Sequence, residues 1–273
     1  MKIKGCQGKY VTEIGVKEFT FPDGQPHVKL GCGSHPGDVT ITAPIRNGTD
    51  LLSVLLVEET LRHEGARFVS LFITYLLGAR MDRRIGPGEP FTLKVVAGLL
   101  KDQFDKIHVL DPHSDVACAL LDADSVSPIE FIRKAVIHDG DMEWYPSENV
   151  AFCAPDAGAA KKVEGYAAEL GGFKVVQCLK HRDMMTGKLS GFKLASDENV
   201  PERVLIVDDI CDGGGTFVGV AELLRAHGAK WVGLYVTHGI FSKGFDLKGI
   251  DRIFTTTSYR DTYPDNITIV GRP

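Results

Sequence analysis

The chain has 273 residues, of which 44% are hydrophobic and 25% are charged, so it can bury a sizeable core without disulfides or a structural metal. Its formal net charge of −5 argues against a general nucleic-acid coat, because such proteins present a basic surface. It has no apolar run near the roughly 20 residues of a membrane helix and no apolar signal-peptide segment at its start. Six single cysteines without a Cys-x-x-Cys pair are typical of a reduced, cytoplasmic protein. We therefore expect neither a nucleic acid nor a membrane as partner.

Short β-branched runs alternate with longer amphipathic stretches in the first half of the chain. The strands that this pattern predicts span residues 39–42, 66–74 and 106–111. The helices that it predicts span residues 50–64, 89–103 and 127–137. We expect Asp50 to be the N-cap of the first helix. The stretch 138–149 is polar and turn-rich, so we expect a boundary there between domains 1–143 and 144–273.

The second half repeats this rhythm. The predicted strands span residues 150–155, 174–179, 203–209 and 230–237. The predicted helices span residues 157–170 and 215–227. The run RVLIVDD (203–209) is almost continuously apolar, as in a parallel sheet buried on both faces. We therefore expect an α/β protein of two tandem doubly wound domains with mainly parallel sheets, without a strong residue-level repeat between them.

The segment VLIVDDICDGGGTF (204–217) carries the sharpest functional signal. A buried strand ends in two acids, and a glycine-rich turn leads into a helix. Ligands of open α/β sheets bind at the carboxyl ends of strands, and helix N-termini favour phosphate. The glycines let the backbone approach an anion, whereas Asp208 and Asp209 would repel phosphate and suit the vicinal hydroxyls of a sugar. The segment therefore predicts a site for a sugar phosphate.

This segment resembles the ribose-5-phosphate loop of the type I phosphoribosyltransferase fold. The rest of the chain narrows the resemblance to the phosphoribosyl diphosphate synthetases, or ribose-phosphate pyrophosphokinases. Seven motifs follow the family's order: FPDGQ (21–25), PIRNGTD (44–50), YLLGARMDRR (75–84), DPHSD (111–115), APDAGAAKK (154–162), CLKHR (178–182) and THGIFS (237–242). Each is weak alone, but seven in order are specific. The resemblance implies that the diphosphoryl group of ATP is transferred to C1 of ribose 5-phosphate, giving phosphoribosyl diphosphate and AMP.

The resemblance also assigns roles in the second half. It implies that Lys180 and Arg182 are catalytic, lie on a mobile loop, and stabilise the charge on the transferred group. It implies that ribose 5-phosphate binds Asp208, Asp209, Asp212, Gly213, Gly214, Gly215 and Thr216. The segment TGKLSG (186–191) suits a lid or hairpin.

The resemblance assigns the binding of the nucleotide to the first half of the chain. The resemblance implies that ATP binds Phe21, Asp23, Gln25, Arg80, Asp82 and His113, in part across a subunit boundary. It also implies a cofactor, Mg²⁺, held by His113 and Asp156. Because Mg²⁺ prefers oxygen ligands, the histidine rests on the resemblance alone.

The proposed reaction, apart from any resemblance, requires positively charged groups at the site. Diphosphoryl transfer must neutralise concentrated negative charge while aligning the reacting oxygens. The chain has neither a GxxxxGK[ST] loop nor a kinase-type glycine loop. The remaining candidates are three clusters: Arg80/Arg83/Arg84, Lys161/Lys162 and Lys180/His181/Arg182. The family match favours Arg80, Lys180 and Arg182, and leaves Lys161 and Lys162 open.

Several positions depart from the family pattern. Gln25 stands for a glutamate, Met81 for a glutamine and Ala159 for a glycine. Gly213 stands for a threonine and removes one hydroxyl donor, so we expect weaker but not absent binding. The chain is also short for the family, so we expect a homo-oligomer in which a dimer is favoured over a hexamer.

Two other functions fit parts of the pattern. A phosphoribosyltransferase that makes a nucleotide from a base would share the 204–217 loop, but it would not need the N-terminal motifs. A non-catalytic regulatory relative would explain the departures at residues 25, 81 and 213. The retained Lys180 and Arg182 oppose that alternative.

Overall fold

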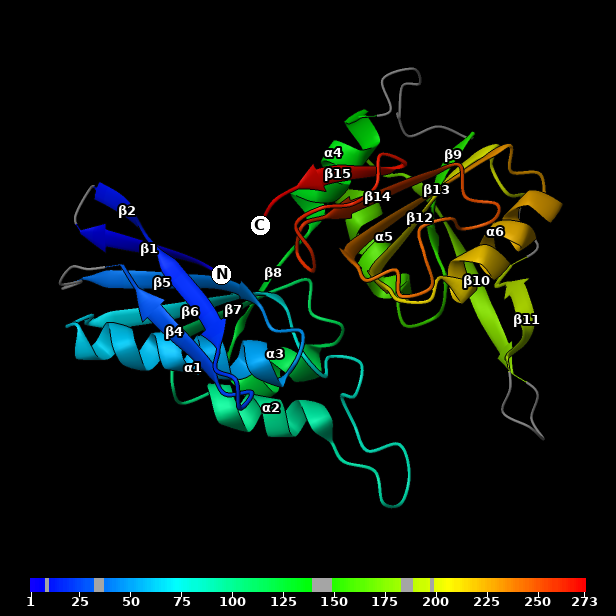
Figure 1. The fold of residues 1–273 in the computed structure, drawn as a ribbon. Helices are drawn as coiled ribbons and strands as arrows, with labels where there is room; N and C mark the ends of the chain where they lie inside the picture. The colour runs from blue at the N-terminus through cyan, green and yellow to red at the C-terminus, as the bar shows by residue number, and fades with distance from the viewer. Residues whose placement is uncertain (8–9, 32–36, 139–148, 183–188, 197–198) are drawn as a thin grey trace. The chain divides into compact units, whose positions relative to one another are not determined.

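The computed structural model describes residues 1–273 except 8–9, 32–36, 139–148, 183–188 and 197–198 (Figure 1). The chain divides into two compact units, Met1–Ser127 and Pro128–Pro273. The predicted boundary between residues 143 and 144 lies outside the described residues. Helix α4 (Ile129–His138) packs into a core of the second unit through Ile132 and Ala135. It therefore belongs to the second unit, although the prediction assigned it to the first.

The first unit is built on a six-stranded sheet in the order β2-β1-β5-β6-β7-β8. Its strands are β1 (Lys2–Gln7), β2 (Tyr10–Ile14), β5 (Asp38–Pro44), β6 (Phe68–Tyr75), β7 (Lys106–Leu110) and β8 (Asp124–Val126). Strands β5 to β8 are parallel, whereas β1 is antiparallel to both neighbours. A separate antiparallel hairpin pairs β3 (Val16–Thr20) with β4 (Pro26–Leu30).

The helices of this unit are α1 (Gly48–His63), α2 (Thr92–Leu100) and α3 (Asp115–Leu121). Residues that alternate along β5 and β6, such as Ile41 and Leu71, share one core with Val54 of α1 and Leu93 of α2. This alternation is what a strand buried on one face requires. The helices therefore pack against the apolar face of the parallel strands.

The second unit has a seven-stranded sheet in the order β11-β10-β9-β12-β13-β14-β15. Its strands are β9 (Val150–Ala154), β10 (Lys174–Arg182), β11 (Leu189–Leu194), β12 (Arg203–Cys211), β13 (Trp231–Gly239), β14 (Arg252–Thr256) and β15 (Ile267–Gly271). All neighbours are parallel except β10 and β11. Its helices are α4, α5 (Ala160–Glu169) and α6 (Gly215–Ala226).

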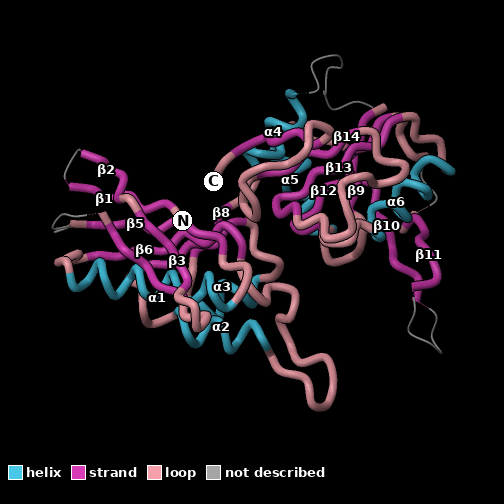
Figure 2. Tube along the Cα trace, in the orientation of Figure 1, coloured by secondary structure: helices cyan, strands magenta, loops and turns pink. Residues whose placement is uncertain are grey.

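The two faces of this sheet bury different helices (Figure 2). Helix α6 shares a core with Ile206, whereas α4 and α5 share the opposite core with Leu205. The chain leaves β9 toward β10 but leaves β12 toward β13. The point at which the direction reverses lies between β9 and β12, which is where ligands of such sheets bind.

The α/β class with mainly parallel sheets in two units is confirmed. The apolar run predicted for β12 is buried throughout the strand except at Asp208. None of the helices in the described ranges is long and apolar enough to cross a membrane.

The start of α1 differs from its prediction. Its N-cap is Asn47, whose side chain accepts a hydrogen bond from the backbone N–H of Asp50 at 2.9 Å. The Asp50 carboxylate in turn accepts from the backbone and the guanidinium of Arg46. The helix begins at Gly48, before the first apolar residue, so Asp50 lies in the first turn rather than at the cap.

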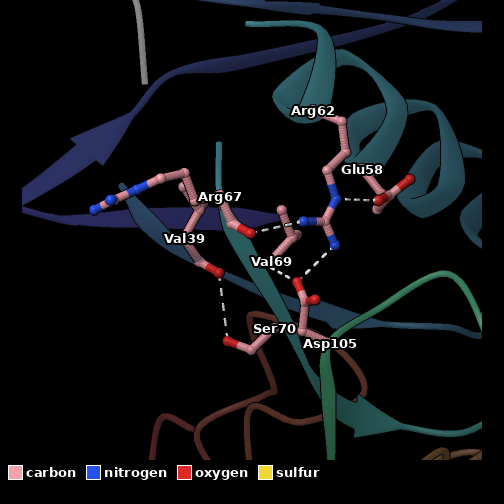
Figure 3. Close-up of polar contacts among 7 residues, drawn as sticks. All are labelled: Val39, Glu58, Arg62, Arg67, Val69, Ser70 and Asp105. Carbon is pink, nitrogen blue, oxygen red and sulfur yellow. Dashed lines mark hydrogen bonds and ion pairs between the residues drawn. The ribbon is translucent and has the colours of Figure 1, made fainter. Parts of the chain in front are cut away.

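Arg62, near the end of α1, ties the helix to two strands (Figure 3). Its guanidinium donates to Glu58 at 2.8 Å, to the carbonyl of Arg67 at 3.1 Å and to Asp105 at 2.6 Å. The same Asp105 oxygen accepts the N–H of Val69 at 2.7 Å. Burial tends to raise the pKa of Asp105, but the hydrogen bonds from Val69 and Arg62 outweigh it and lower that pKa. We call this arrangement of arginine, carbonyl, carboxylate and strand N–H the clasp.

A second clasp, with the same arrangement of groups, occurs in the second unit. Arg225 of α6 donates to the carbonyl of Lys230 at 3.2 Å and to Asp251 at 2.6 Å. That Asp251 oxygen accepts the N–H of Val232 at 2.7 Å. The segments align as LRHEGARFV (61–69) and LRAHGAKWV (224–232). This short match is not a strong repeat of the sequence. Its meaning appears only in the structure, where each arginine meets an aspartate 43 or 26 residues away.

Substitution of Asp105 by asparagine should lower the free energy of unfolding by about 1 kcal/mol at pH 7, because solvent screens hydrogen bonds to a carboxylate that is a third exposed. The folded pKa is depressed, so this contribution is present above the ordinary aspartate pKa of 3.8 and is lost as the pH falls through the folded value. Urea unfolding at pH 7 and in acid checks both statements. The control is Asp102→Asn, an exposed acid of the same loop. Equal stability of the two variants at pH 7 would contradict the clasp's contribution.

Candidate active site

The loop between β12 and α6 leads from a buried strand into the N-terminus of a helix. Gly214 takes the N-cap position of α6 with a left-handed φ of 75°, and the helix start has no side-chain cap. A Cβ on Gly215 would meet nothing within 4 Å, so space is open beside the first helical residue. Because the N-terminus of a helix carries a partial positive charge, this loop can bind a phosphate group.

The two glycines should respond differently to alanine. Gly214→Ala should lower the free energy of unfolding by about 2 kcal/mol, because a left-handed backbone disfavours a Cβ and that Cβ would collide with Leu247. The matched control, Gly215→Ala, faces open space and should leave stability nearly unchanged. Thermal unfolding of both variants measures the difference. Equal melting temperatures would contradict the role of the left-handed turn.

The paired acids lie at the end of β12. Asp209 is 8% exposed, and its backbone N–H donates to the Asp208 carboxylate at 2.9 Å. Burial, and then the neighbouring charge of Asp209, raises the pKa of Asp208 well above its usual range. Carboxylates so close together are well suited to accept hydrogen bonds from two adjacent hydroxyls of one ligand.

Lys180 and Asp156 are brought together from neighbouring strands. The Lys180 ammonium lies 2.6 Å from Asp156 Oδ2, while Asp156 Oδ1 accepts the N–H groups of Gly158 and Ala159 at 2.9 and 3.2 Å. Burial tends to raise the pKa of Asp156, but the bond to Lys180 and these N–H groups outweigh it and lower that pKa. The charge of Asp156 also raises the pKa of Asp208, so the acids share one neighbourhood. The result is an ionised carboxylate holding a cation.

These residues share one edge because β9, β10, β12 and β13 are parallel neighbours. Lys180 and Arg182 lie on strand β10, so the expectation that they lie on a loop is wrong. The side chain of Arg182 is not described. The predicted lid or hairpin is partly seen: β11 pairs antiparallel with β10, and residues 183–188 lie outside the described ranges.

Buried thiols lie beneath this edge. The sulfurs of Cys153 and Cys178 are 3.7 Å apart. The hydrogen bond with Cys178 and then burial raise the pKa of Cys153, and burial raises the pKa of Cys211 to about 12. Both Cys153 and Cys211 therefore stay protonated near neutral pH and fill space. Cys153, Cys178 and Cys211 are free thiols, in agreement with the reduced cysteines that the sequence predicted.

A second loop lies on the first. The N–H groups of Ile240 and Phe241 donate to the carbonyl of Cys211 at 2.9 and 3.1 Å, and that of Ser242 donates to the carbonyl of Asp212 at 3.0 Å. This loop follows β13, and the THGIFS motif ends at Ser242. The next residue, Lys243, was not singled out in the sequence, although its side chain lies directly against Gly213.

The predicted nucleotide residues of the first unit lie in three loops. Phe21, Asp23 and Gln25 share the β3–β4 turn, in which the N–H of Phe21 donates to the carbonyl of Gln25 at 2.8 Å. The Asp23 carboxylate accepts the N–H of Gln25 at 3.1 Å. All three side chains are exposed. The turn therefore presents one aromatic and two polar side chains together.

The other nucleotide candidates follow neighbouring strands. Arg80 and Asp82 lie in the loop after β6, and His113 lies in the loop after β7. Because β6 and β7 are parallel neighbours, both loops lie at the same edge of the sheet. His113 is exposed. Their roles toward ATP stay predictions.

The predicted metal pair draws one ligand from each unit, His113 from the first and Asp156 from the second. Across the described ranges, no group of three or more His, Cys, Asp or Glu side chains is arranged to hold a metal ion. The metal site therefore stays a prediction.

Known proteins share this architecture. Residues 127–262 match the family model of the phosphoribosyl transferase domain, so the second unit is of the phosphoribosyltransferase class. A ribose-phosphate pyrophosphokinase of Rhizobium meliloti is 30% identical over 234 residues, which cover 82% of this chain and 71% of that protein. One from Thermococcus kodakarensis is 27% identical over 274 residues, which cover 97% of this chain and 90% of that protein. The chain belongs to the ribose-phosphate pyrophosphokinase family.

A solved structure extends the likeness to the fold. The crystal structure of phosphoribosylpyrophosphate synthetase from Mycobacterium smegmatis matches with a TM-score of 0.78, covers 94% of this chain and 86% of that one, and is 22% identical. The family and the fold predicted from the motifs are confirmed, and the chain is an enzyme of this transferase family.

Proposed function

We propose that the chain transfers the β,γ-diphosphoryl group of ATP to the C1 hydroxyl of ribose 5-phosphate, giving phosphoribosyl diphosphate and AMP. One observation carries the proposal: an uncapped helix start, a pair of acids and a lysine held by a carboxylate lie at one edge of the second sheet. A sugar phosphate needs the first two features together, and diphosphoryl transfer needs the third.

The sugar phosphate would bind by its two ends. The loop from Asp212 to Thr216 takes the 5-phosphate on backbone N–H groups at the start of α6. Asp208 and Asp209 accept hydrogen bonds from the ribose hydroxyls, which fixes the C1 hydroxyl at the edge where Lys180 lies. This positioning converts the attack into an effectively unimolecular step.

Lys180 and Arg182 would stabilise the group in transfer. The Lys180 ammonium is held by Asp156 at 2.6 Å, so its charge is placed before substrate arrives. Electrostatic stabilisation of this kind acts on charge that develops in the transition state. Phe21, Asp23, Gln25, Arg80, Asp82 and His113 would bind ATP.

Asp156 fits a role in holding Mg²⁺. Its pKa is lowered, so it is ionised at neutral pH, and Mg²⁺ is commonly bound by one or two carboxylates together with substrate phosphates and waters. With His113, it would hold an ion that neutralises phosphate charge. Removal of divalent ions with EDTA should abolish turnover, and added Mg²⁺ should restore it.

The proposal includes a cytoplasmic homo-oligomer in which a dimer is favoured over a hexamer. Phe19 and Phe21 are 37% and 43% exposed and meet edge to face with ring centroids 5.2 Å apart. Two exposed rings, one near the end of β3 and one in the turn that follows it, suit contact with a neighbouring subunit. Light scattering on the purified protein measures the assembly.

A coupled assay for AMP tests the activity. AMP should form from ATP only when ribose 5-phosphate and Mg²⁺ are both present. Base-dependent release of pyrophosphate from phosphoribosyl diphosphate would instead identify a transferase that makes nucleotides. Nucleotide binding without turnover would identify a regulatory relative.

A further inference from the structure

We propose that Lys243 binds the phosphate of the sugar-phosphate substrate and takes over the role of the side chain that Gly213 lacks. This inference rests on the proposed function and adds a binding residue that no sequence motif named.

The contact between the two positions is direct. A Cβ built on Gly213 would lie 3.3 Å from Lys243 Cδ, 3.4 Å from Cε and 3.7 Å from Cγ. The methylene chain of the lysine thus lies in close contact with the point at which a side chain at residue 213 would begin. Because a C–N single bond is about 1.45 Å long, the ammonium lies within about 5 Å of that point.

The backbone around Lys243 is fixed independently of its side chain. Ser242 donates to the carbonyl of Asp212, and the buried Phe241 takes a left-handed φ of 49°. The N–H of Gly244, with a φ of 102°, donates to the carbonyl of Phe241 at 3.1 Å. Removal of the ammonium should therefore leave the loop in place.

The charges around the loop favour a cation. Asp208, Asp209 and Asp212 place three carboxyl groups within five residues of the phosphate-binding turn, and a dianionic phosphate would meet their charge. Lys180 is already paired with Asp156. Lys243 is exposed, and no hydrogen bond or ion pair engages its ammonium within the described part of the chain. Its charge is available to an anion on the loop.

The residue types at positions 213 and 243 fit together. A threonine at residue 213, which the family resemblance implies, would press against the lysine chain, because its Cβ alone would already lie 3.3 Å from Lys243 Cδ. Gly213 makes room for Lys243, and an ammonium replaces a hydroxyl as the donor. Charge-assisted hydrogen bonds are about twice as strong as neutral ones, so the lysine offsets the weaker binding that the loss of the threonine hydroxyl alone would cause.

The test compares three variants. Lys243→Met keeps the methylene packing but removes the charge, and should raise the KM for ribose 5-phosphate about tenfold with kcat and the KM for ATP within twofold of the original. Lys243→Arg should restore most of the affinity. The control is Lys248→Met, whose side chain is 86% exposed and 3.9 Å from Glu222, and it should change nothing. An unchanged KM for ribose 5-phosphate in Lys243→Met, or a fall in kcat alone, would overturn the inference.

Calorimetry with ribose 5-phosphate separates this inference from the proposed function. If the original protein does not turn over, the proposed function fails, and the loss of binding in Lys243→Met still decides the role of the lysine. A paired variant, Gly213→Thr with Lys243→Ala, should bind more tightly than Lys243→Ala alone. Equal or weaker binding would refute the exchange of roles.

Discussion

Replacement of Lys180 by methionine should lower kcat by roughly 100- to 1,000-fold, the usual cost of removing one group that stabilises charge in a transition state. The KM for ribose 5-phosphate should change by less than threefold, because the ammonium is held by Asp156 rather than by the sugar-phosphate loop. Single-turnover measurement of AMP formation separates the chemical step from product release.

The matched control for Lys180 lies on the same strand. Lys174 begins β10 and donates to the carbonyl of Asn199 at 3.2 Å, at the edge opposite to the candidate site. Lys174→Met should leave kcat within twofold. A rise in the KM for ribose 5-phosphate without loss of kcat in Lys180→Met would contradict its role in the transfer and indicate substrate binding instead.

Replacement of Asp208 by asparagine should reduce activity and raise stability together. The amide oxygen can still accept the N–H of Asp209, but the hydrogen bond from a ribose hydroxyl to a charged group is lost, so kcat/KM should fall by roughly 10- to 100-fold. Burial and the charge of Asp209 raise the folded pKa of Asp208, so keeping it ionised in the fold costs free energy that the amide avoids.

The sign of the stability effect follows from linkage. A carboxyl whose folded pKa is raised loses stability as the pH rises from its ordinary value of 3.8 through the folded value. Asp208→Asn should therefore melt at a higher temperature than the original protein at pH 8 and at the same temperature near pH 3. The exposed Asp246 supplies the control, Asp246→Asn, which should show no such pH dependence. A destabilised Asp208→Asn at pH 8 would contradict this account.

The central strands β9, β10, β12 and β13 of the second sheet were predicted because their signal is local, whereas β11, β14 and β15 were not. β12 is buried on both faces and reads as an apolar run, and the following glycines mark the turn. The first 30 residues were not predicted, although they form four strands. In β3 four of five residues are exposed. Its sequence therefore lacks the alternation of apolar and polar residues that identifies a strand. The short α3 and β8, with seven and three residues, carry too little sequence for a periodic signal.

The candidate site divides in the same way. The 212–216 loop is contiguous, so its residue types reveal it. The contact of Lys180 with Asp156 spans 24 residues and depends on β9 pairing with β10, which no spacing rule specifies. Lys243 meets Gly213 only because the loops after β12 and β13 pack together. Sequence analysis can therefore identify the site residues within one loop, but it cannot predict which loops contact one another in the fold.

The twin clasps make the two helix starts that precede them comparable. Both α1 and α6 follow a parallel strand and begin with Gly-Thr, yet they end in opposite electrostatic states. At α1 the Asn47 side chain accepts the backbone N–H of Asp50, and the Asp50 carboxylate adds a negative charge. This helix start therefore does not favour an anion. At α6 the glycine cap leaves the donors open. Capping can thus give two similar helix starts different roles: the start of α1 is stabilised by its own side chains, and the start of α6 keeps its partial positive charge for a ligand.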